Sequence, residues 1–366
     1  MPLHIAIDAS RTTVPNITGT ERYALESIRA LIQRNATLDE PHTLTLYFRD
    51  KPAPDLFPQS EHVQQQVLWP PRLWTQISLA RAVARDKPDV TWVPAHTLPF
   101  LLRGKAVVTV HDIGYRVYPS AHPLRQRIPL EVYTRFSQRR ADIVLADSIA
   151  TARDLTRYYE TPRDKIRVVY PGLTSPLVGD VDEVRRRYNI PERYWLHIGT
   201  LQPRKNIAAL VGAYHQWKAA NPEVPTALVL AGSKGWKFNP QWITGDGVIV
   251  TGYITEEEKG ALLEGAFGLV FPSLYEGFGF PVLEAMSVGT PVICSDNASL
   301  PEVGGDVPLY AKANNVLMLS DHMNILTEEP DTRAAMSERG RAQAAKFTWD
   351  RTAQGVLAAL EEAARG

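Results

Sequence analysis

The chain contains 366 residues, of which 44% are hydrophobic, and its 40 basic and 40 acidic side chains give a formal net charge of zero. This composition gives no reason to expect a disordered chain or a nucleic-acid partner. No apolar run approaches the ~20 residues that a membrane-spanning helix needs. The length exceeds the usual limit of a single hydrophobic core, so we expect two α/β domains of roughly 170–180 residues each.

The start of the chain and its cysteine content bear on the compartment. The first residues, MPLHIAIDAS, have the pattern of a strand and lack the basic-then-apolar order of a secretory signal. The one cysteine, Cys294, lies in the apolar run PVICS, so it cannot form an internal disulfide and we expect it to be buried. We therefore expect a cytoplasmic protein, with peripheral attachment to the inner face of the membrane as an alternative.

Short apolar runs alternate with longer amphipathic stretches, which is typical of βαβ units with parallel sheets. In the first half these runs are HIAIDA, LTLYF, DVTWVP, AVVTVHD, ADIVLAD and IRVVYPG, and in the second half they are WLHIGT, ALVLAG, VIVTGY, GLVFPS and PVICS. Between the two sets lies a segment rich in Gly, Pro and charges. We predict a first domain over 1–175, a linker over 176–193 and a second domain over 194–347, with a C-terminal helix over about 348–366 returning to the first domain.

The region after the first strand, RTTVPNITGTERYALESIRAL, contains no G-x-G-x-x-G, which argues against a dinucleotide-binding dehydrogenase. Gly19 and Thr20 instead precede an amphipathic helix that we expect from about Glu21. A glycine at a helix start can let a phosphate or an acceptor approach the N–H groups, although Gly also serves as a plain N-cap.

Two histidines follow predicted strands of the first half. His111 comes after AVVTV and His96 after DVTWVP, so each lies at the carboxyl end of a strand, the edge where open α/β sheets bind ligands. Position alone does not separate a catalytic from a structural histidine. We interpret His96 as a candidate acceptor-side residue, Asp112 as an orienting or capping group, and Ser148 as a helix N-cap.

The segment 101–140 has a local excess of positive charge. Its acidic residues are Asp112 and Glu131. Its basic residues are Arg103, Lys105, Arg116, Arg125, Arg127, Arg135, Arg139 and Arg140. These side chains could be solvated helix faces, or they could form a basic face that meets anionic lipid, at roughly 1 kcal/mol per cation. The second alternative would suit an acceptor that is a lipid-linked glycan.

The second domain opens with WLHIGTLQPRKNIAAL, where Arg204 and Lys205 stand directly before a predicted helix. Cations are unfavourable at a helix N-terminus because the helix dipole is already positive there. They make sense where an anion binds, since Arg can fork two phosphate oxygens and Lys acts as a point charge. A solvated pair on a loop is the alternative. Tyr253, after the run VIVTG, is a candidate for contact with a nucleotide base.

The segment PSLYEGFGFPVLEAMSVGTP, residues 272–291, carries the most specific pattern. Glu276 lies on a strand-to-helix loop, and we expect Pro281 at the first helical position, with Glu284 in the first helical turn. Unpaired N–H groups and the positive helix end make such a junction a ready phosphate site. Two carboxylates beside a phosphate site suit hydroxyl groups, such as those of a ribose and a sugar. The segment therefore predicts a nucleotide-sugar site, with a first-turn acid and a solvated loop charge as the alternative.

This segment closely resembles the motif of the retaining glycosyltransferases of family 4, which have the GT-B fold: two Rossmann-like domains that face each other across a cleft, with the last helix crossing back to the first domain. The resemblance implies that Glu276 contacts the transferred sugar, that the loop amides hold sugar and diphosphate, and that Glu284 binds the ribose hydroxyls. It assigns catalytic roles to His111 and Glu276. It assigns donor binding to Gly19, Thr200, Arg204, Lys205, Gly277, Phe278, Gly279, Phe280 and Glu284, and we add Tyr253 from its position after a strand. Many members carry Arg at the position of Thr200, so the phosphate site here would hold one cation fewer.

The resemblance implies a metal-independent transfer with retention of configuration, in which the leaving phosphate helps to deprotonate the acceptor. The sequence agrees in that it has no D-x-D between apolar runs and no His/Cys cluster with ligand spacing. We expect no cofactor beyond the nucleotide-sugar co-substrate. The patterns GTLQPRKN, VHDIG and PRLWTQISLARAV resemble bacterial mannosyltransferases of O-antigen and capsule assembly, which points to GDP-mannose as donor and to a glycan or lipid-linked glycan as acceptor.

Three other functions are compatible with parts of this pattern. A nucleotide-sugar epimerase of GT-B fold would turn over its donor without an acceptor. A phosphorylase-like enzyme would need a lysine that carries pyridoxal phosphate, and no motif supports one. A catalytically silent protein would bind the sugar nucleotide and never turn it over. UDP-sugars remain open as donors, because the residues that would contact the base are not evident from the sequence.

Overall fold

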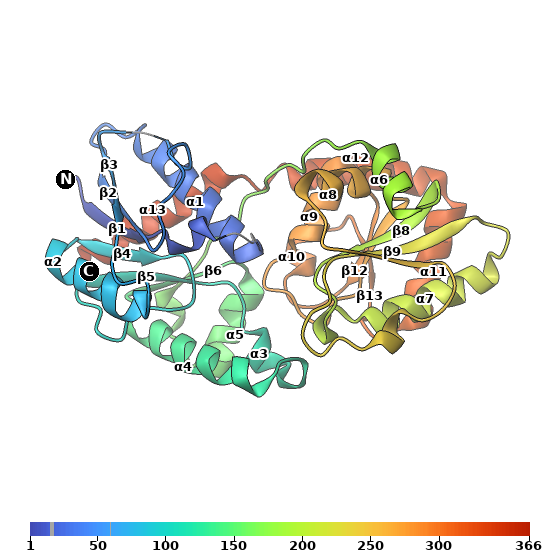
Figure 1. The fold of residues 1–366 in the computed structure, drawn as a ribbon, viewed down its shortest axis with the longest axis horizontal. Helices are drawn as coiled ribbons and strands as arrows, with labels where there is room; N and C mark the ends of the chain where they lie inside the picture. Colours follow the sequence, from blue (N-terminus) through green and yellow to red (C-terminus); the bar gives the residue numbers. More distant parts are fainter. Residues whose placement is uncertain (15–17, 59) are drawn as a thin grey trace. The chain divides into compact units, whose positions relative to one another are not determined.

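The computed structural model describes residues 1–14, 18–58 and 60–366. The chain divides into two compact units, each built on its own parallel sheet (Figure 1). The first unit comprises Met1–Arg116, Leu124–Gly172 and Phe347–Gly366, and the second comprises Val117–Pro123 and Leu173–Lys346. The prediction of two Rossmann-like domains is confirmed, since every pairing of the named strands is parallel.

The sheet of the first unit has seven strands in the order β3-β2-β1-β4-β5-β6-β7. The strands are β1 (His4–Asp8), β2 (Thr43–Phe48), β3 (Val63–Val67), β4 (Val90–Val93), β5 (Lys105–Val110), β6 (Ile143–Ala146) and β7 (Ile166–Val168). The strand order reverses between β1 and β4, and all strands end at the same edge. Central strands such as β4 and β6 are buried at every position, because helices cover both faces of the sheet.

Helices α1 and α13 pack together on one face of this sheet, and α4 and α5 lie on the other (Figure 1). The helices of this part of the chain are α1 (Gly19–Asn35), α2 (Ala80–Asp86), α3 (Gly114–Val117), α4 (Leu124–Arg140), α5 (Ile149–Tyr159) and α13 (Trp349–Arg365). The last helix belongs to the first unit because its apolar stripe, with Val356 and Leu360 fully buried, completes the core under β1 and β4. The predicted return of the C-terminal helix is therefore confirmed.

The sheet of the second unit has six strands in the order β10-β9-β8-β11-β12-β13. The strands are β8 (Arg193–Ile198), β9 (Thr226–Ala231), β10 (Val248–Gly252), β11 (Gly268–Phe271), β12 (Val292–Ser295) and β13 (Leu309–Ala311). Its strand order reverses between β8 and β11, which are hydrogen-bonded neighbours. This is the topological switch point, where open α/β sheets form a crevice for ligands.

Helices α7 and α11 cover one face of the second sheet, and α8, α9 and α12 cover the other (Figure 1). The helices are α6 (Val181–Tyr188), α7 (Ile207–Ala220), α8 (Glu256–Gly265), α9 (Phe280–Val288), α10 (Leu300–Gly304), α11 (Val316–Glu328) and α12 (Pro330–Ala344). The segment that we expected to be a linker contains α6, which buries Val184 and packs on α8. Cys294 is buried in β12, as expected.

Two edge strands of the structure are missing from the predicted set. Strand β3 has the sequence VQQQV and is partly or fully exposed along its length, so it lacks an apolar pattern. Strand β13 has three residues, too few for a period to show. Each is an edge strand with a single neighbour, so it needs less burial than a central strand. Backbone hydrogen bonds hold β3 on β2 and β13 on β12.

Candidate active site

The predicted cations and the first predicted glutamate meet at the switch point of the second sheet. Lys205 lies seven positions beyond the end of β8, and Glu276 lies on the loop after β11. Because β8 and β11 are adjacent and parallel, their following loops emerge side by side. Leu274 N donates to Arg204 O at 2.8 Å, which ties the two loops together.

Glu276 accepts hydrogen bonds from three side chains. Its Oε2 atom lies 2.9 Å from Nη1 of Arg204, and its Oε1 atom lies 2.7 Å from Nζ of Lys205 and 2.5 Å from Oγ of Ser273. The side chains are 13%, 9% and 9% exposed for Arg204, Lys205 and Glu276. The structure therefore answers the question of why two cations precede α7, since the Glu276 carboxylate is an anion that they contact.

The charges of this cluster decide the protonation of Glu276. Burial by itself would raise the pKa of the carboxyl, but Arg204 and Lys205 outweigh burial and lower the pKa to about 2. Glu276 is therefore ionised at neutral pH. Together these three side chains carry one net positive charge, which favours a further anion beside them.

The Lys205 side chain also contacts Phe271 and Gly199. Its Nζ atom lies 4.6 Å from the centre of the Phe271 ring, and its methylenes approach Gly199, where an added Cβ would lie 3.3 Å from Cε of Lys205. His197 lies behind it, fully buried, and burial together with the Lys205 charge lowers the pKa of His197 to about 4. A neutral imidazole and an aromatic face thus flank the ammonium group.

The loop 277–280 is held in one conformation by glycine geometry and by a serine. Gly279 is the N-cap of α9 with a φ of 114°, a left-handed conformation that favours glycine. Ser299 Oγ donates to the carbonyl oxygens of Glu276 at 2.9 Å and Phe278 at 2.6 Å. The rings of Phe278 and Phe280 pack edge to face at 5.1 Å. The loop is thus rigidly tied where it enters the positive end of the helix.

Glu284 lies in the second turn of α9, not in the first as we expected. The helix begins at Phe280, one residue before Pro281, so Glu284 is its fifth residue. The Glu284 carboxylate is buried and its Oε1 atom accepts a hydrogen bond from Nζ of Lys259 on α8 at 2.6 Å. Lys259 also contacts Glu256 at 2.9 Å. The second glutamate therefore has a cationic partner of its own.

Two further donor-site candidates of the second unit are exposed. Thr200 lies two positions after the end of β8, and its methyl group would meet a Cβ added at Gly235 at 2.5 Å. Tyr253 directly follows β10 and is 71% exposed. They follow two different strands of the second sheet, at the same carboxyl edge as the cluster.

In the first unit, His111 follows β5 and pairs with Asp147, which follows β6. Nδ1 of His111 lies 2.7 Å from Oδ2 of Asp147, and both residues are buried. Burial alone would lower the pKa of His111, but the Asp147 carboxylate outweighs it and raises the pKa above its usual value. The ring of Tyr23 from α1 packs edge to face on His111 at 4.8 Å. Nε2 of His111 lies 3.2 Å from the carbonyl oxygen of Pro94, so both ring nitrogens face acceptors and the orientation of the ring is fixed.

His96, which lies beside His111, is neutral at neutral pH. Burial and the charge of the nearby His111 lower the pKa of His96 to about 3. Its Nε2 atom accepts from the backbone N–H of His111 at 3.3 Å. Asp112 Oδ1 accepts from Gly114 N at 2.7 Å, which is the capping role that we expected. Ser148 caps α5 through Thr151 N at 3.0 Å, which confirms that prediction.

Gly19 is the first residue of α1, so the helix begins two residues earlier than we expected. The reason is a capping box, in which Thr18 is the N-cap and Glu21 reaches back to the Thr18 N–H at 3.2 Å. Gly19 is exposed. Residues 15–17, which precede it in the predicted glycine loop, lie outside the described residues.

Three residues that complete these sites were not predicted. Asp147 could have been found, because it follows the apolar run DIVLA just as His111 follows AVVTV. Lys259 lies within a helix of mixed charge, and nothing in its local sequence distinguishes it from a solvated lysine. Ser299 lies 23 positions after Glu276 and becomes part of the loop only through folding.

Two protein families match this chain. "Glycosyl transferases group 1" matches residues 180–343, and "Glycosyltransferase Family 4" matches residues 17–174. The chain is 32% identical over 362 residues to the O-antigen chain mannosyltransferase B of Escherichia coli, with 91% of this chain and 93% of the relative covered. The chain belongs to glycosyltransferase family 4, and the protein is a glycosyltransferase.

Solved structures show the same fold. The sucrose-phosphate synthase of Thermosynechococcus elongatus superposes with a TM-score of 0.74 at 20% identity, over 98% of each chain. HepE of Anabaena, crystallised with UDP-glucose, superposes with a TM-score of 0.72 at 18% identity, over 98% of this chain and 100% of that one. The fold is GT-B, as the sequence predicted.

Two kinds of feature, a metal-binding cluster and a membrane-spanning helix, are absent from the described part of the chain. Residues 1–14, 18–58 and 60–366 contain no group of three or more His, Cys, Asp or Glu side chains that could hold a metal ion. None of the helices described combines the length and the hydrophobicity that crossing a bilayer requires.

Proposed function

We propose that this glycosyltransferase transfers mannose from GDP-mannose to a glycan or lipid-linked glycan, with retention of configuration and without a metal ion. The observation that carries the proposal is the cluster of Arg204, Lys205 and Glu276 at the switch point of the second sheet. The mannosyltransferase to which the chain is 32% identical supports the choice of sugar.

The cluster suits a nucleotide diphosphate that leaves as an anion. Arg204 and Lys205 supply positive charge beside the loop that leads into α9, and the N-terminus of this helix would add N–H donors at the same place. Lys205 and Arg204 would stabilise the developing negative charge, and this stabilisation increases as the bond to the sugar breaks. Such a site performs the role that a divalent cation fills in other transferases.

The two glutamates suit hydroxyl groups in different parts of the donor. Glu276 is ionised and lies on the loop beside the phosphate site, so it would accept a hydrogen bond from a hydroxyl of the transferred mannose. Glu284, a turn further along α9, would accept hydrogen bonds from the ribose hydroxyls. Thr200 and Tyr253 would line the diphosphate and the base.

The transfer replaces one bond to the anomeric carbon by another. The bond from that carbon to the phosphate oxygen breaks, the bond to the acceptor oxygen forms on the same face, and the acceptor proton passes to the leaving phosphate. In the first unit, His111 would contact the transferred sugar. Its partner Asp147 would hold the imidazole in place. Gly19 would let the donor or acceptor approach the start of α1.

Nucleotide selectivity and chelation test the proposal directly. At equal concentration GDP should raise the melting temperature more than UDP, because a ligand stabilises the folded state in proportion to RT ln(1 + [L]/Kd). Donor hydrolysis and transfer should persist in EDTA. A clear preference for UDP would overturn the mannose donor, and loss of transfer in EDTA would overturn the metal-free reaction.

A further inference from the structure

Helix α4 has the reverse of the usual pattern of a surface helix, which buries apolar side chains and exposes polar ones. The buried side chains of α4 are polar, namely Thr134, Ser137 and Gln138. Its exposed side chains include large hydrophobic ones, with exposures of 66% for Leu124, 62% for Ile128, 36% for Leu130 and 50% for Val132. The apolar side of this helix therefore faces away from the core of the first unit.

Hydrogen bonds on the inner side hold α4 in this orientation. Ser137 Oγ accepts from the backbone N–H of Leu98 at 2.9 Å, and Thr161 Oγ1 donates to Oε1 of Gln138 at 2.9 Å. Rotating the helix to bury Ile128 would break both bonds and leave buried polar groups without partners. The exposure of the apolar residues is thus built into the fold.

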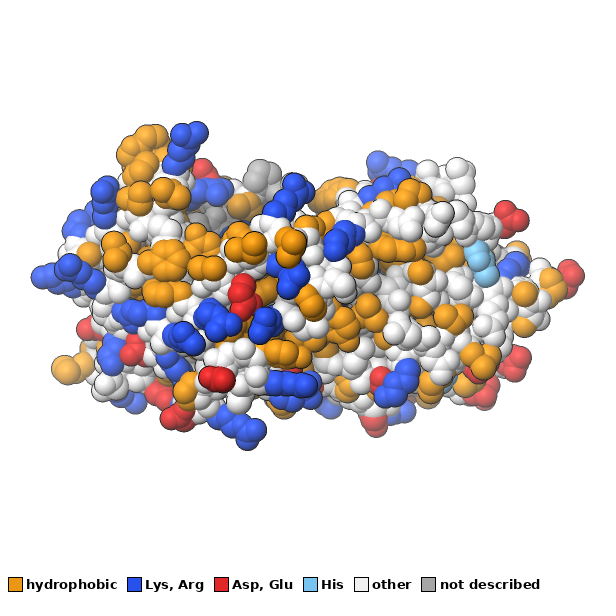
Figure 2. All heavy atoms as spheres, turned by 90° about the horizontal axis from the view of Figure 1, so that it is seen from below, with side chains coloured by type: hydrophobic (Ala, Val, Ile, Leu, Met, Phe, Trp, Pro, Cys, Tyr) orange, Lys and Arg blue, Asp and Glu red, His pale blue; other side chains and the backbone are white. Residues whose placement is uncertain are grey.

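The neighbouring loop extends the apolar surface. Phe100 is 44% exposed and Leu101 79% exposed. The Phe100 ring stacks on Tyr133 at 5.4 Å and meets Phe136 edge to face at 4.8 Å. We call α4 together with Phe100 and Leu101 the α4 face. Figure 2, which looks from below onto the side of the molecule where α4 lies in Figure 1, shows hydrophobic side chains beside Lys and Arg side chains.

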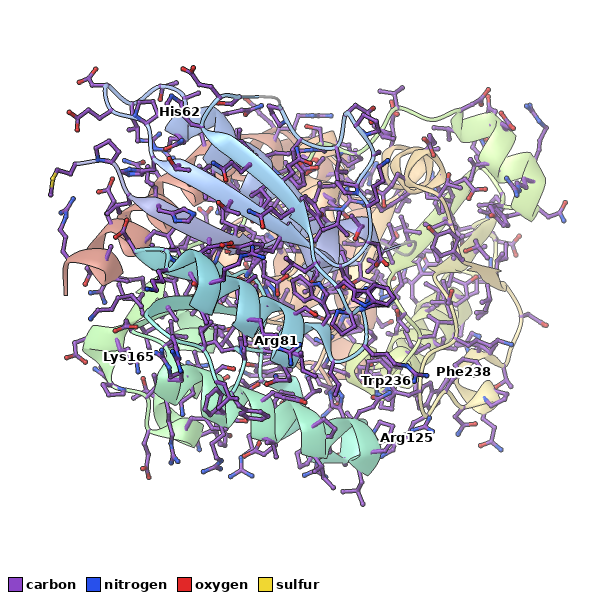
Figure 3. All side chains as sticks on the ribbon, turned by 60° about the vertical axis from the view of Figure 1, so that its left-hand side comes forward. His62, Arg81, Arg125, Lys165, Trp236 and Phe238 are labelled. Carbon is purple, nitrogen blue, oxygen red and sulfur yellow. The ribbon has the colours of Figure 1, made fainter. Side chains whose placement is uncertain are left out.

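The charge of the α4 face is strongly positive. Its five arginines are Arg125, Arg127, Arg135, Arg139 and Arg140, and its one acid is Glu131, which pairs with Arg135 at 2.9 Å. Figure 3 shows Arg125 at the start of the helix and Lys165 near its other end, where Lys165 Nζ donates to Arg139 O at 2.8 Å. Cations therefore lie toward both ends of α4, on either side of Glu131.

A hollow on the α4 face is lined by both apolar and basic side chains. It has a volume of about 460 Å³ and is lined by Val132, Arg135, Phe136, Arg139 and Arg140. Arg140 is fixed at its rim because Nη2 donates to the carbonyl oxygens of Leu102 and Gly104. An apolar floor with guanidinium groups around it suits a phosphate head group attached to hydrocarbon.

We propose that the α4 face docks the first unit on an anionic lipid bilayer. The exposed apolar side chains enter the boundary between head groups and acyl chains, and the arginines pair with lipid phosphates. A second copy of this chain is the less suitable partner, because two such faces would bring ten arginines against two glutamates. The proposal does not depend on the identity of the sugar donor.

Co-sedimentation of the full chain with lipid vesicles tests the proposal. Wild type should bind vesicles that contain one quarter phosphatidylglycerol and bind pure phosphatidylcholine weakly. Replacing Arg125 and Arg139 together by Gln should weaken binding to the anionic vesicles about thirtyfold, because each cation contributes about 1 kcal/mol there. Replacing Ile128 and Val132 together by Gln should weaken it about tenfold, and the binding lost should be the part that resists high salt.

Matched substitutions in the second unit are the controls. Leu317→Gln removes an apolar side chain that is 56% exposed, and Arg186→Gln removes an exposed arginine of α6, so both should bind vesicles as wild type does. Equal binding of wild type to neutral and anionic vesicles would overturn the proposal. So would wild-type binding by the Ile128/Val132 variant, or a dimer in vesicle-free solution that this variant dissociates, since a second copy would then cover the face.

Discussion

Nζ of Lys259 lies 2.6 Å from Oε1 of Glu284, and this contact joins two neighbouring helices, α8 and α9, across the proposed nucleotide site. Both side chains are buried, at 11% and 6% exposure. The carboxylate that we assign to the ribose hydroxyls is therefore already paired and oriented before a nucleotide binds. Lys259 acts here as a positioning residue for Glu284.

We expect Lys259→Met to destabilise the fold and weaken nucleotide binding. It leaves the Glu284 carboxylate buried without its cation, and breaking a buried pair in this way costs about 3–5 kcal/mol. Urea unfolding and calorimetry with GDP measure the two effects. Glu256→Gln is the matched control, because Glu256 contacts the same lysine but is 42% exposed, and exposed pairs contribute about 0–1 kcal/mol. Equal stability of the two variants would contradict the positioning role.

The two glutamates should respond differently to substitution. Glu276→Gln should lower turnover by orders of magnitude and leave GDP affinity unchanged or raised, because Arg204 and Lys205 no longer share their charge with a carboxylate. Glu284→Ala should weaken GDP and donor alike by about tenfold or more, since charged hydrogen bonds contribute roughly 1.5–3 kcal/mol each.

Calorimetry with GDP and turnover assays separate the two glutamates. Ser273→Ala is the control for Glu276, because it removes one hydrogen bond to the carboxylate and keeps all three charges. Its loss of turnover should be small beside that of Glu276→Gln. If Glu276→Gln weakens GDP as much as Glu284→Ala does, the two roles are assigned to the wrong residues.

The stability of the second unit should depend on the ionisation of Glu276 in acid. Its pKa is about 2 in the folded protein and 4.5 in the absence of its partners. A depressed pKa stabilises the fold at pH values above the unfolded value, and this contribution is lost as the pH falls from about 4.5 to about 2. It amounts to about 3 kcal/mol, at 1.36 kcal/mol per pKa unit.

Chemical unfolding of wild type and Glu276→Gln as a function of pH measures this contribution. The difference in unfolding free energy between the two proteins should be constant from pH 7 to pH 5 and should shrink below about pH 4.5. A difference that is already shrinking between pH 7 and pH 6 would show that another group, not Glu276, is responsible.

Asp147→Asn should lower the pKa of His111, which is above its usual value in wild type. Burial disfavours the charged imidazole, and Asp147 is the largest of the groups that oppose burial, ahead of the Pro94 carbonyl and Asp112. NMR titration of the His111 ring protons in both proteins measures the change, and the pH profile of turnover should move with it. Asp112→Asn is the comparison, because Asp112 bonds the backbone N–H of Gly114 and raises the pKa of His111 less than Asp147 does, so the fall in pKa should be smaller. An unchanged His111 titration in Asp147→Asn would contradict the pairing.

The alternation of apolar runs and amphipathic stretches was sufficient to predict both sheets, since central strands are buried on both faces and must be apolar. It failed at β3, because the side chains of VQQQV are exposed and only backbone bonds to β2 hold the strand. Helix starts were predicted to within two residues. The errors at α1 and α9 came from local capping, by Thr18 with Glu21 and by Gly279.

The sequence by itself determined where the proposed donor site of the second unit should lie. Arg204 and Lys205 stand before a helix start, where cations are unfavourable, and Glu276 and Glu284 lie in one specific local motif. Tertiary structure alone decided what each of them contacts. Glu276 lies 71 positions from Lys205, Glu284 lies 25 from Lys259, and Asp147 lies 36 from His111. Contacts at such separations follow from which strands and helices are adjacent, and that order depends on packing of the whole sheet, which no local pattern encodes.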